Sequence, residues 1–259
     1  MKKIISWNVN GVRACIKKGL LDFLVKEKPD VLGMQEIKAN LDQISGKEFS
    51  APAGYQPVLF PAEKPGYSGV GAYIKQSLEC KTTLGLGVKE FDKEGRSMTL
   101  ELDDMIFVNA YFPNSQEAGR RLKYKLDFCE AIKDYLDKLT KKGKPILVSG
   151  DYNIAHKEID LARPKDNEDS PGFLPEERAW MDKFLAKDYF DTFRIFNEEP
   201  GNYTWWSMRT NARSRNVGWR IDYHCVNKHL KDRVVKSYHN TDVLGSDHCP
   251  ITIMIKGAS

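Results

Sequence analysis

The sequence predicts a single domain, residues 1–259, in which β-strands alternate with α-helices. Three observations point to this mixed class. Short apolar runs of β-formers recur along the chain, and residues 145–149 are the clearest of them. Before that run, apolar residues at spacings of three and four over 122–139 indicate a helix with one buried face. No low-complexity tract or linker interrupts the chain, so strand, helix and strand should follow one another within one domain.

The apolar run at residues 145–149 is expected to be a buried strand, and two oxygen-bearing side chains, Asp151 and Asn153, follow it. Residues two positions apart in an extended segment point to the same side, so these side chains should emerge together. Gly150 should permit a sharp exit from the strand. A strand followed by an Asx-rich turn would give the same pattern without any chemistry. Whether Asp151 and Asn153 belong to a functional site therefore depends on the residues at the ends of the other strands.

The other elements follow in order, and several of the strands also end in polar residues. In the first part of the chain the sequence predicts a strand over 3–9, a turn over 10–13, a helix over about 19–28, and strands over 30–36 and 66–74. Beyond them, we expect a hairpin of 96–102 and 105–112, helices over 122–139 and 176–186, and strands over 219–226, 234–239 and 251–256. Residues 160–172 contain two prolines and should form a long surface loop, a feature that is often functional.

Composition and charge limit the possible partners and the compartment. Lys and Arg together number 40 and Asp and Glu 36, so the net charge of +4 permits a polyanionic partner without requiring one. The five cysteines are odd in number and lack CxxC spacing, which favours buried free thiols over disulfides or a zinc site. No apolar run is long enough for a signal peptide or a membrane span. We therefore expect an intracellular, cytoplasmic protein with no membrane partner, and a monomer because heptads and an apolar surface stripe are absent.

The polar residues at strand ends and turns form a set that suits a hard cation. Its members are Asn8, Glu36, Tyr111, Asp151, Asn153, Asp222, Asp247 and His248. Carboxylate and amide oxygens are preferred ligands of Mg²⁺ or Mn²⁺, and a cation held by few carboxylates keeps positions open for phosphate oxygens. Zinc is less suitable because the five histidines show no HxxxH spacing and the thiols are scattered. The set therefore predicts phosphoester hydrolysis.

Segments that contain these residues strongly resemble the exonuclease III family of apurinic/apyrimidinic (AP) endonucleases. They are SWNVNGVRA at 6–14, QEIK at 35–38, GDYNIAH at 150–156 and GSDHCPI at 245–251. Residues 211–213 and 216–223 are similar to the DNA-repair branch in particular, and the match covers nearly the whole chain in the family's order. The resemblance implies an α+β fold, a DNase I-like four-layer αββα sandwich in which two mixed β-sheets pack face to face with helices on the outside. One endonuclease/exonuclease/phosphatase domain would then span residues 1–259.

The resemblance also implies an activity and a role for individual residues. It implies incision of duplex DNA on the 5′ side of an abasic site to leave a 3′-hydroxyl, with accessory 3′-5′ exonuclease activity and 3′-phosphodiesterase activity on blocked 3′ ends. By motif, Glu36 resembles the principal Mg²⁺ ligand. Asp151 would orient or deprotonate the attacking water, with help from Asn8 and Asn153. Asp247, together with those three residues, would contribute to a second or shifted metal position.

The same motifs imply contacts with phosphate and substrate. His248 would touch the scissile phosphate while Asp222 holds its imidazole, and Tyr111 would sit against the same phosphate. The family's small apolar pocket, which admits a flipped sugar without its base, is matched by Trp205, Trp219 and Ile221. Candidate phosphate or groove contacts to double-stranded DNA are Arg13, Lys38, Tyr67, Asn114, Arg121, Asn167 and Arg213.

Two departures from the family's pattern leave questions open. After Asn114 the arrangement of glycines and arginines in animal members is not reproduced, so the sequence does not say which of Arg120 and Arg121, if either, enters the DNA. Asn10 stands where some members carry Asp, which removes one negative charge near the metal. The number of cations is therefore open.

Two other functions stay open at this level. Another phosphoesterase on the same scaffold, acting on phosphoinositides or sphingomyelin, would keep the metal residues but would not need the motif around Trp219. A DNA-binding module without catalysis would be expected to lack one or more of Glu36, Asp151 and His248, and all three are present. The leading prediction is the Mg²⁺-dependent abasic-site endonuclease.

Overall fold

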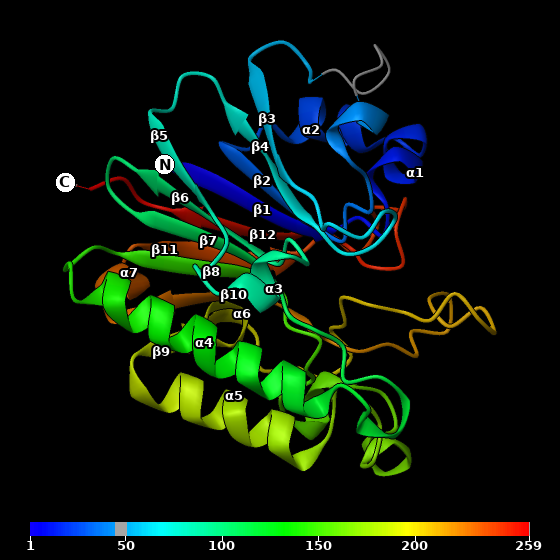
Figure 1. Ribbon diagram of the computed structural model, residues 1–259. Helices are drawn as coiled ribbons and strands as arrows, with labels where there is room; N and C mark the ends of the chain where they lie inside the picture. The colour runs from blue at the N-terminus through cyan, green and yellow to red at the C-terminus, as the bar shows by residue number, and fades with distance from the viewer. Residues whose placement is uncertain (45–50, 259) are drawn as a thin grey trace.

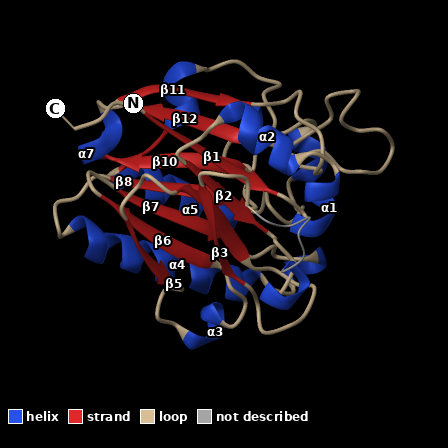
Figure 2. Ribbon diagram, turned by 90° about the horizontal axis from the view of Figure 1, so that it is seen from above, coloured by secondary structure: helices blue, strands red, loops and turns tan. Residues whose placement is uncertain are grey.

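The computed structural model describes residues 1–44 and 51–258, and in it two β-sheets pack face to face between outer helices (Figures 1 and 2). Each sheet has six strands and contains both parallel and antiparallel pairs. The layers are therefore helix, sheet, sheet and helix. This is the four-layer αββα sandwich that the resemblance implied.

The first sheet gathers strands from both ends of the chain. Its order is β11 (Val234–His239), β12 (Ile251–Ile255), β1 (Lys2–Asn8), β2 (Val31–Gln35), β4 (Val70–Lys75) and β3 (Tyr55–Phe60). Strand β1 runs parallel to β2 and antiparallel to β12. The outer side of this sheet is covered by α1 (Val12–Lys17) and α2 (Leu20–Glu27), as Figure 1 shows.

The second sheet is built from the middle of the chain. Its order is β5 (Cys80–Leu84), β6 (Ser97–Leu102), β7 (Ile106–Tyr111), β8 (Ile146–Asp151), β10 (Asp222–Asn227) and β9 (Tyr189–Asp191). Its outer side is covered by α4 (Leu122–Thr140) and α5 (Pro175–Lys187) (Figure 1). Strands β7 and β8 are parallel, and α4 connects them. The shorter helices are α3 (Lys89–Asp92), α6 (Thr192–Phe196) and α7 (Lys228–Lys231).

The apolar core lies in layers that follow the alternation of side chains along the strands. In β8, Leu147 belongs to the cluster between the sheets, whereas Ile146 and Val148 on either side of it pack with α4 and α5. The sheets approach closely: a Cβ added to Gly33 would lie 2.9 Å from the ring of Phe107. Burial of apolar side chains on both faces of strands such as β8 stabilises the sandwich.

A buried polar link joins the two sheets near one edge. Gln35 Nε2 donates to Asn109 Oδ1 at 2.6 Å. Asn109 Nδ2 donates in turn to the carbonyl oxygens of Met34 at 3.0 Å and Gly71 at 2.9 Å. Because an unpaired buried amide is unfavourable, these bonds disfavour any other placement of one sheet on the other.

Parallel strand pairs bring polar strand ends to that same edge. Asn8 at the end of β1 lies beside Gln35 at the end of β2, and Tyr111 at the end of β7 lies beside Asp151 at the end of β8. The side-chain amide of Asn8 donates to Asp151 across the sandwich at 2.8 Å. The carboxyl ends of both pairs therefore meet at one place.

Most predicted strands and helices are present, with ends shifted by a few residues, but three boundaries were wrong. Arg13 lies within α1 because Gly11, at φ 102°, turns the chain directly into the helix. The strand expected from residue 66 begins at Val70 because Gly69 has φ 85°, outside the extended region. The strand expected from residue 219 begins at Asp222, since the residues before it form isolated bridges to two loops.

Two expectations around β8 also need correction. Gly150 was expected to permit a sharp exit, but it lies within the strand, where a Cβ would come 1.8 Å from the carbonyl oxygen of Ala110. Its lack of a side chain lets β7 and β8 pair closely. The loop over 160–172 is not wholly at the surface, because Asp160 at its start is 1% exposed.

The thiols behave as the sequence predicted. All five cysteines are free, and four of them are buried. Burial raises the pKa of Cys15 to about 12, so this thiol stays protonated and unreactive. No helix in the described part of the chain combines the length and the apolar composition that a membrane span requires.

A buried ion network anchors Asp160. Its Oδ1 lies 2.8 Å from Arg220 Nε and 2.6 Å from Arg194 Nη2, and Arg220 also pairs with Asp191 at 2.7 Å. Burial opposes ionisation, but the two guanidinium groups outweigh it and lower the pKa of Asp160 to about 2. Since this lies below the value of roughly 3.9 in an unfolded chain, ionised Asp160 stabilises the fold above about pH 4, and that contribution is lost as the pH falls toward about 2.

We expect Asp160→Asn to destabilise the protein by about 3–5 kcal/mol at neutral pH, because it breaks a buried charge pair. The variant should also lose less additional stability than the wild type on acidification from about pH 4 to about pH 2. Urea denaturation across this range measures both effects. Asp127→Asn, at an exposed pair on α4, is the control and should stay within about 0.5 kcal/mol of the wild type. Equal acid sensitivity of wild type and Asp160→Asn would contradict the assignment.

Candidate active site

A cavity of about 410 Å³ opens at the edge where the polar strand ends meet. Many of the predicted site residues line it: Glu36, Lys38, Tyr111, Asn114, Asp151, Asn153, Asn167, Trp205, Trp219, Ile221, Asp247 and His248. Asn8 and Asp222 lie directly behind this lining, buried and bonded to Asp151 and His248 respectively. The other predicted contacts, Arg13, Tyr67, Arg121 and Arg213, are not part of the lining.

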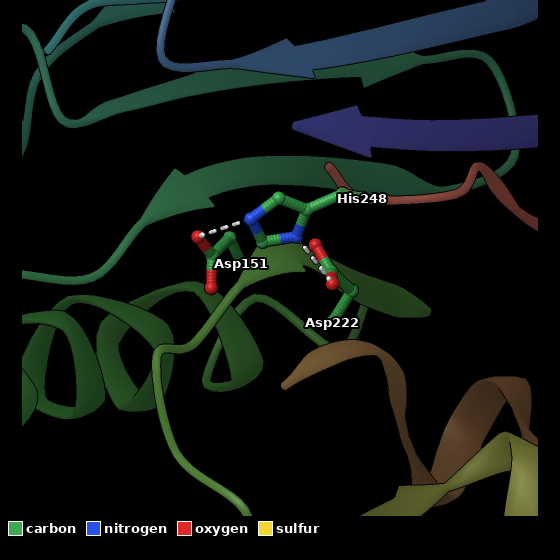
Figure 3. Close-up of side chains that lie close together, drawn as sticks. All are labelled: Asp151, Asp222 and His248. Atoms are coloured by element: carbon green, nitrogen blue, oxygen red, sulfur yellow. Dashed lines mark hydrogen bonds and ion pairs between the residues drawn. The ribbon is translucent and has the colours of Figure 1, made fainter. Parts of the chain in front are cut away.

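Two carboxylates flank one imidazole in the wall of the cavity (Figure 3). Asp222 Oδ2 lies 2.8 Å from His248 Nδ1, and Asp151 Oδ2 lies 3.9 Å from His248 Nε2. Asp151 ends β8 and Asp222 begins β10, directly opposite each other in the antiparallel pair. His248 comes from the loop before β12 in the other sheet. The imidazole therefore enters between the two acids only when the sandwich is assembled.

Three hydrogen bonds hold the carboxylate of Asp151. Oδ1 accepts from the backbone N–H of Asn153 at 2.8 Å, and Oδ2 accepts from the side-chain amides of Asn8 at 2.8 Å and Asn153 at 3.2 Å. Asn153 reaches the acid through a turn rather than an extended chain, because its φ is 51°. Burial, with the charge of Asp222, raises the pKa of Asp151 to about 7, against the opposing effect of the His248 charge. A carboxylate with this pKa can take up a proton near neutral pH.

The imidazole of His248 is fixed from two sides. Nδ1 faces Asp222, whose Oδ2 also accepts from the hydroxyl of Thr204 at 2.6 Å. The backbone carbonyl of His248 accepts from the indole N–H of Trp7 at 3.0 Å. Burial opposes a charged ring, but the surrounding carboxylates, Asp222 foremost, raise the pKa of His248 to about 10. The ring is therefore a cation at neutral pH, which suits contact with a phosphate oxygen.

Thr204 and Trp7 were not among the predicted site residues. Both are buried, Trp7 inside the first strand and Thr204 within the aromatic run 203–207, so each resembles a core residue in the sequence. The contact that gives Trp7 its role joins positions 241 residues apart. No local pattern in the sequence predicts this contact.

Glu36 places a partly exposed carboxylate in the cavity. It follows β2 with φ 55°, its Oε2 accepts from Asn8 Nδ2 at 3.1 Å, and its Oε1 pairs with Lys38 at 2.8 Å. Asn8 donates from the same nitrogen to Asp151. Asn8 thus presents its amide nitrogen to both carboxylates, while its Oδ1 accepts from the backbone N–H of Asn10 at 3.0 Å. The carboxylate oxygens of Glu36 and Asp151 are the groups here that fit a hard cation such as Mg²⁺.

A second group is close enough to be considered for a metal. Ligand atoms of Asp151, Asp222 and His248 lie within 4.8 Å of one another. A charged imidazole has no free lone pair, and Nδ1 is already engaged with Asp222, so this group fits a hydrogen-bonded relay better than a metal site. The residues that fit a cation are Glu36 and, beside it, Asp151, whereas Asn8, predicted as a metal ligand, turns its amide nitrogen toward them.

Asp247 belongs to a different part of the lining. Its Oδ1 accepts from Asn10 Nδ2 at 2.9 Å, and its Oδ2 accepts from the indole N–H of Trp205 at 3.0 Å. Despite burial, the His248 charge and these donors lower the pKa of Asp247, so the group stays ionised. Asn10 also accepts from Lys38 Nζ at 2.6 Å. An ionised aspartate at position 10 could not donate to Asp247, so this departure from the family changes how Asp247 is held.

Tyr111 ends β7 at the cavity and is backed by Arg96, a buried residue that was not predicted. Arg96 Nη1 donates to the carbonyl oxygen of Tyr111 at 3.1 Å, and its guanidinium carbon lies 5.0 Å from the centre of the Tyr111 ring. Burial, with the charges of Glu36 and Asp151, raises the pKa of the Tyr111 hydroxyl well above its ordinary value. The hydroxyl therefore remains a hydrogen-bond donor at neutral pH.

The structure shows how Arg120 and Arg121 differ, which the sequence could not do. Arg121 donates from Nη1 to the hydroxyl of Tyr67 at 2.5 Å and from Nη2 to Glu94 at 2.8 Å, so its guanidinium is anchored. The side chain of Arg120 is 71% exposed and meets Glu117 at 3.5 Å. An exposed guanidinium in so weak a pair is available to an incoming phosphate.

Aromatic side chains form an apolar wall beside His248. The rings of Trp205 and Trp219 pair edge to face with centres 6.3 Å apart, and Ile221 belongs to the same cluster. Isolated β-bridges join Trp205 to both Trp219 and His248. Gly172 faces this wall, since a Cβ there would lie 3.3 Å from the ring of Trp219. The structure therefore brings the predicted pocket residues together next to the imidazole.

Two surface grooves adjoin the central cavity. One, of about 720 Å³, is lined by Arg13 and Lys17 among others and shares Lys38 with the cavity. The other, of about 420 Å³, shares Asn10 and Asp247 with it. The two grooves also share Ala14, so each adjoins the cavity and they adjoin each other.

The remaining predicted contacts differ in how far they are already bonded. Asn114 donates to Asn153 Oδ1 at 3.1 Å within the cavity. Asn167 donates to a carbonyl of its own loop at 2.9 Å. The guanidinium of Arg213, which was predicted to contact DNA, donates to the backbone carbonyls of Thr241, Val243 and Ser246.

Comparison with known proteins places this geometry in context. The chain matches the Endonuclease/Exonuclease/phosphatase family over residues 5–248. It is 43% identical over 257 residues to a DNA-(apurinic or apyrimidinic site) endonuclease of Dictyostelium discoideum, covering 98% of this chain and 70% of the relative. It is 40% identical over 255 residues to an exodeoxyribonuclease of Bacillus subtilis, covering 98% and 99%. The crystal structure of an AP endonuclease from Leishmania major superimposes with a TM-score of 0.91 at 32% identity, covering 99% of this chain and 88% of that one.

A four-layer sandwich of two mixed sheets, with carboxylates gathered around an imidazole at one edge, defines a hydrolase of the DNase I-like class. The chain belongs to the Endonuclease/Exonuclease/phosphatase family. Its resemblance to the exonuclease III branch, first visible in the motifs, is confirmed by these relatives, and so is the expected fold.

The hydroxyl of Thr204 can be tested as a support for Asp222. It donates to the Asp222 carboxylate and accepts from the backbone N–H groups of Ile221 and Asp222, so Thr204→Val should destabilise the protein by about 1–3 kcal/mol. Thr204→Ser keeps the hydroxyl and should lose only about 1 kcal/mol for the missing methyl. Urea denaturation compares the two. Equal losses would mean that the hydroxyl does not hold Asp222.

Proposed function

We propose that this protein hydrolyses the backbone of duplex DNA on the 5′ side of abasic sites and leaves a 3′-hydroxyl, with accessory 3′-5′ exonuclease and 3′-phosphodiesterase activity on blocked 3′ ends. The observation that carries the proposal is the convergence of Glu36, Asp151 and His248 on one cavity beside an apolar wall. The names of two relatives, an AP endonuclease and an exodeoxyribonuclease, agree with both activities.

The residues of the cavity suit different parts of this reaction. Asp151, with a pKa of about 7, takes a proton from water as the water oxygen bonds to phosphorus. The P–O3′ bond breaks, and the 3′ oxygen takes a proton from solvent and leaves as a hydroxyl. His248 and the hydroxyl of Tyr111 donate to the phosphate oxygens on which negative charge grows. Base catalysis and charge stabilisation are thus carried by separate groups.

Magnesium is the proposed cofactor, and manganese a possible substitute. Glu36 would hold it, with Asp151 within reach and Asn8 donating to both carboxylates, and the bound cation would supply a Lewis acid that polarises a phosphate oxygen. For a second or shifted position we propose Asp247 and Asn153, with Asp151.

Substrate choice is proposed to depend on the apolar wall and the grooves. Trp205, Trp219 and Ile221 would receive a flipped sugar that lacks its base. The phosphates of the duplex would lie along the basic groove at Arg13 and Lys38, and contacts of this kind position DNA without reading its sequence. A phosphoinositide or sphingomyelin does not need an extended basic groove, whereas a duplex does. DNA is therefore the favoured substrate.

The proposed setting follows from the same features. We propose that residues 1–259 form one domain. We also propose that the protein acts as a monomer in the cytoplasm, in the same compartment as its DNA substrate. The five free thiols suit a reducing compartment.

The function is tested with a synthetic duplex that contains one abasic analogue. Purified protein with Mg²⁺ should cut it once, 5′ of the analogue, and the rate should fall by about 100-fold or more in EDTA. A duplex with an ordinary base at that position is the control and should stay intact internally. Binding without cutting in either condition, or hydrolysis of a lipid phosphate alongside an intact duplex, would overturn the proposal.

The role of Asp151 is tested by Asp151→Asn, which keeps the shape of the side chain but cannot accept the proton. We expect cleavage to slow by about 10²- to 10⁴-fold, while the affinity for the abasic duplex changes by no more than about threefold. Single-turnover cleavage and fluorescence anisotropy measure the two quantities. Loss of binding in place of loss of cleavage would reassign Asp151 to a structural role.

A further inference from the structure

A fully buried ion pair lies outside the cavity, between α4 and α5. Lys125 Nζ and Glu177 Oε1 are 2.6 Å apart, and both side chains are 0% exposed. Lys125 is the first residue on the buried face of α4, and the other residues of that face are apolar residues and a cysteine. A pair of well-packed apolar residues could fill such a position at no loss of stability. The presence of charges here therefore calls for another explanation.

The contacts of Lys125 lead to the catalytic turn. Besides Glu177, its Nζ donates to the backbone carbonyl of Asn153 at 2.6 Å. Asn153 is the residue whose backbone and side chain both hold the carboxylate of Asp151. It adopts a left-handed conformation, φ 51°, which the surrounding structure must enforce. Lys125 thus fixes the peptide on which the position of the proposed base depends.

The contacts of Glu177 lead to the rim of the pocket. Its Oε2 accepts from the backbone N–H groups of Gly172 at 2.7 Å and Leu174 at 3.0 Å. Its Oε1 also accepts from the hydroxyl of Ser115, which follows the cavity residue Asn114. Gly172 faces the tryptophan wall, and its carbonyl accepts from the N–H of Ala155 at 2.7 Å. One ion pair therefore ties together the loops that follow β7 and β8 and the loop that precedes α5.

We infer that Lys125 and Glu177 are positioning residues that hold the catalytic turn at Asn153 and the pocket rim at Gly172 in a fixed relation. Neither residue lines the cavity, and the pair acts through these two backbone segments. The expected effect on kinetics rests on the proposed function. The rigidity of the two segments can be measured without any substrate.

The test uses the double variant Lys125→Met/Glu177→Leu, which removes both charges so that neither is left unpaired in the interior. Its melting temperature should stay within about 5 °C of the wild type. On the abasic duplex, kcat should fall by about tenfold or more while KM changes by less than about twofold, because the base is displaced but the DNA contacts remain. Amide hydrogen exchange at Asn153 and Gly172 should be faster by about tenfold or more.

Two comparisons separate positioning from general support. In an Asp151→Asn background, adding the double variant should change the residual kcat by less than about twofold, since the base that the pair positions is already lost. Arg233→Met is the matched control, because Arg233 also pairs with an acid, Asp104, and donates to a carbonyl, that of Lys256 at 2.9 Å, away from the cavity. It should lower the melting temperature without changing kcat.

The outcomes distinguish this inference from the proposed function. A wild type that does not cut abasic DNA overturns the proposed function, and hydrogen exchange then decides the inference alone. Unchanged exchange at Asn153 and Gly172 in the double variant overturns the positioning role. A wild-type kcat in the double variant, or an effect that adds fully to that of Asp151→Asn, overturns it as well.

Discussion

The pairing of β8 with β10 is the constraint on which the site depends, because it sets Asp151 opposite Asp222 and leaves room for one imidazole beside them. Two buried carboxylates this close disfavour each other's ionisation. His248, arriving from the other sheet as a cation, offsets that repulsion and is held by it. Fold and site therefore depend on each other: the sandwich must close to place the imidazole, and the closed sandwich buries acids that need its charge.

Polar side chains extend this dependence through the apolar interior. Asn8 donates to Glu36 in its own sheet and to Asp151 in the other. The link between Gln35 and Asn109 joins the same two sheets. Buried hydrogen bonds of this kind favour one arrangement of the sheets over its alternatives. Groups held in this way are already oriented before a substrate arrives, which is what hydrolysis by positioned groups requires.

The sequence was sufficient for the elements that bury a repeating face, such as α4 and β8, because their own pattern reflects their environment. It was insufficient for β3, β5 and β9. Strand β3 lies at a sheet edge, contains Pro57 and exposes much of its length, while β5 lies at an edge with no buried residue and β9 has three residues. Their pairing comes from a neighbouring strand rather than from their own periodicity.

The sequence by itself determined which chemical groups are available: oxygen donors after several strands and a histidine near the end of the chain, in the order of one family. The tertiary structure decided the protonation and the hydrogen bonding of these groups. It gives Asp151 a pKa near neutrality, makes His248 a cation, anchors Arg121 while Arg120 stays exposed, and binds Arg213 to backbone carbonyls. Ionisation and hydrogen bonding depend on burial and on distances through space, here between residues as far as 241 positions apart, and a local pattern contains neither.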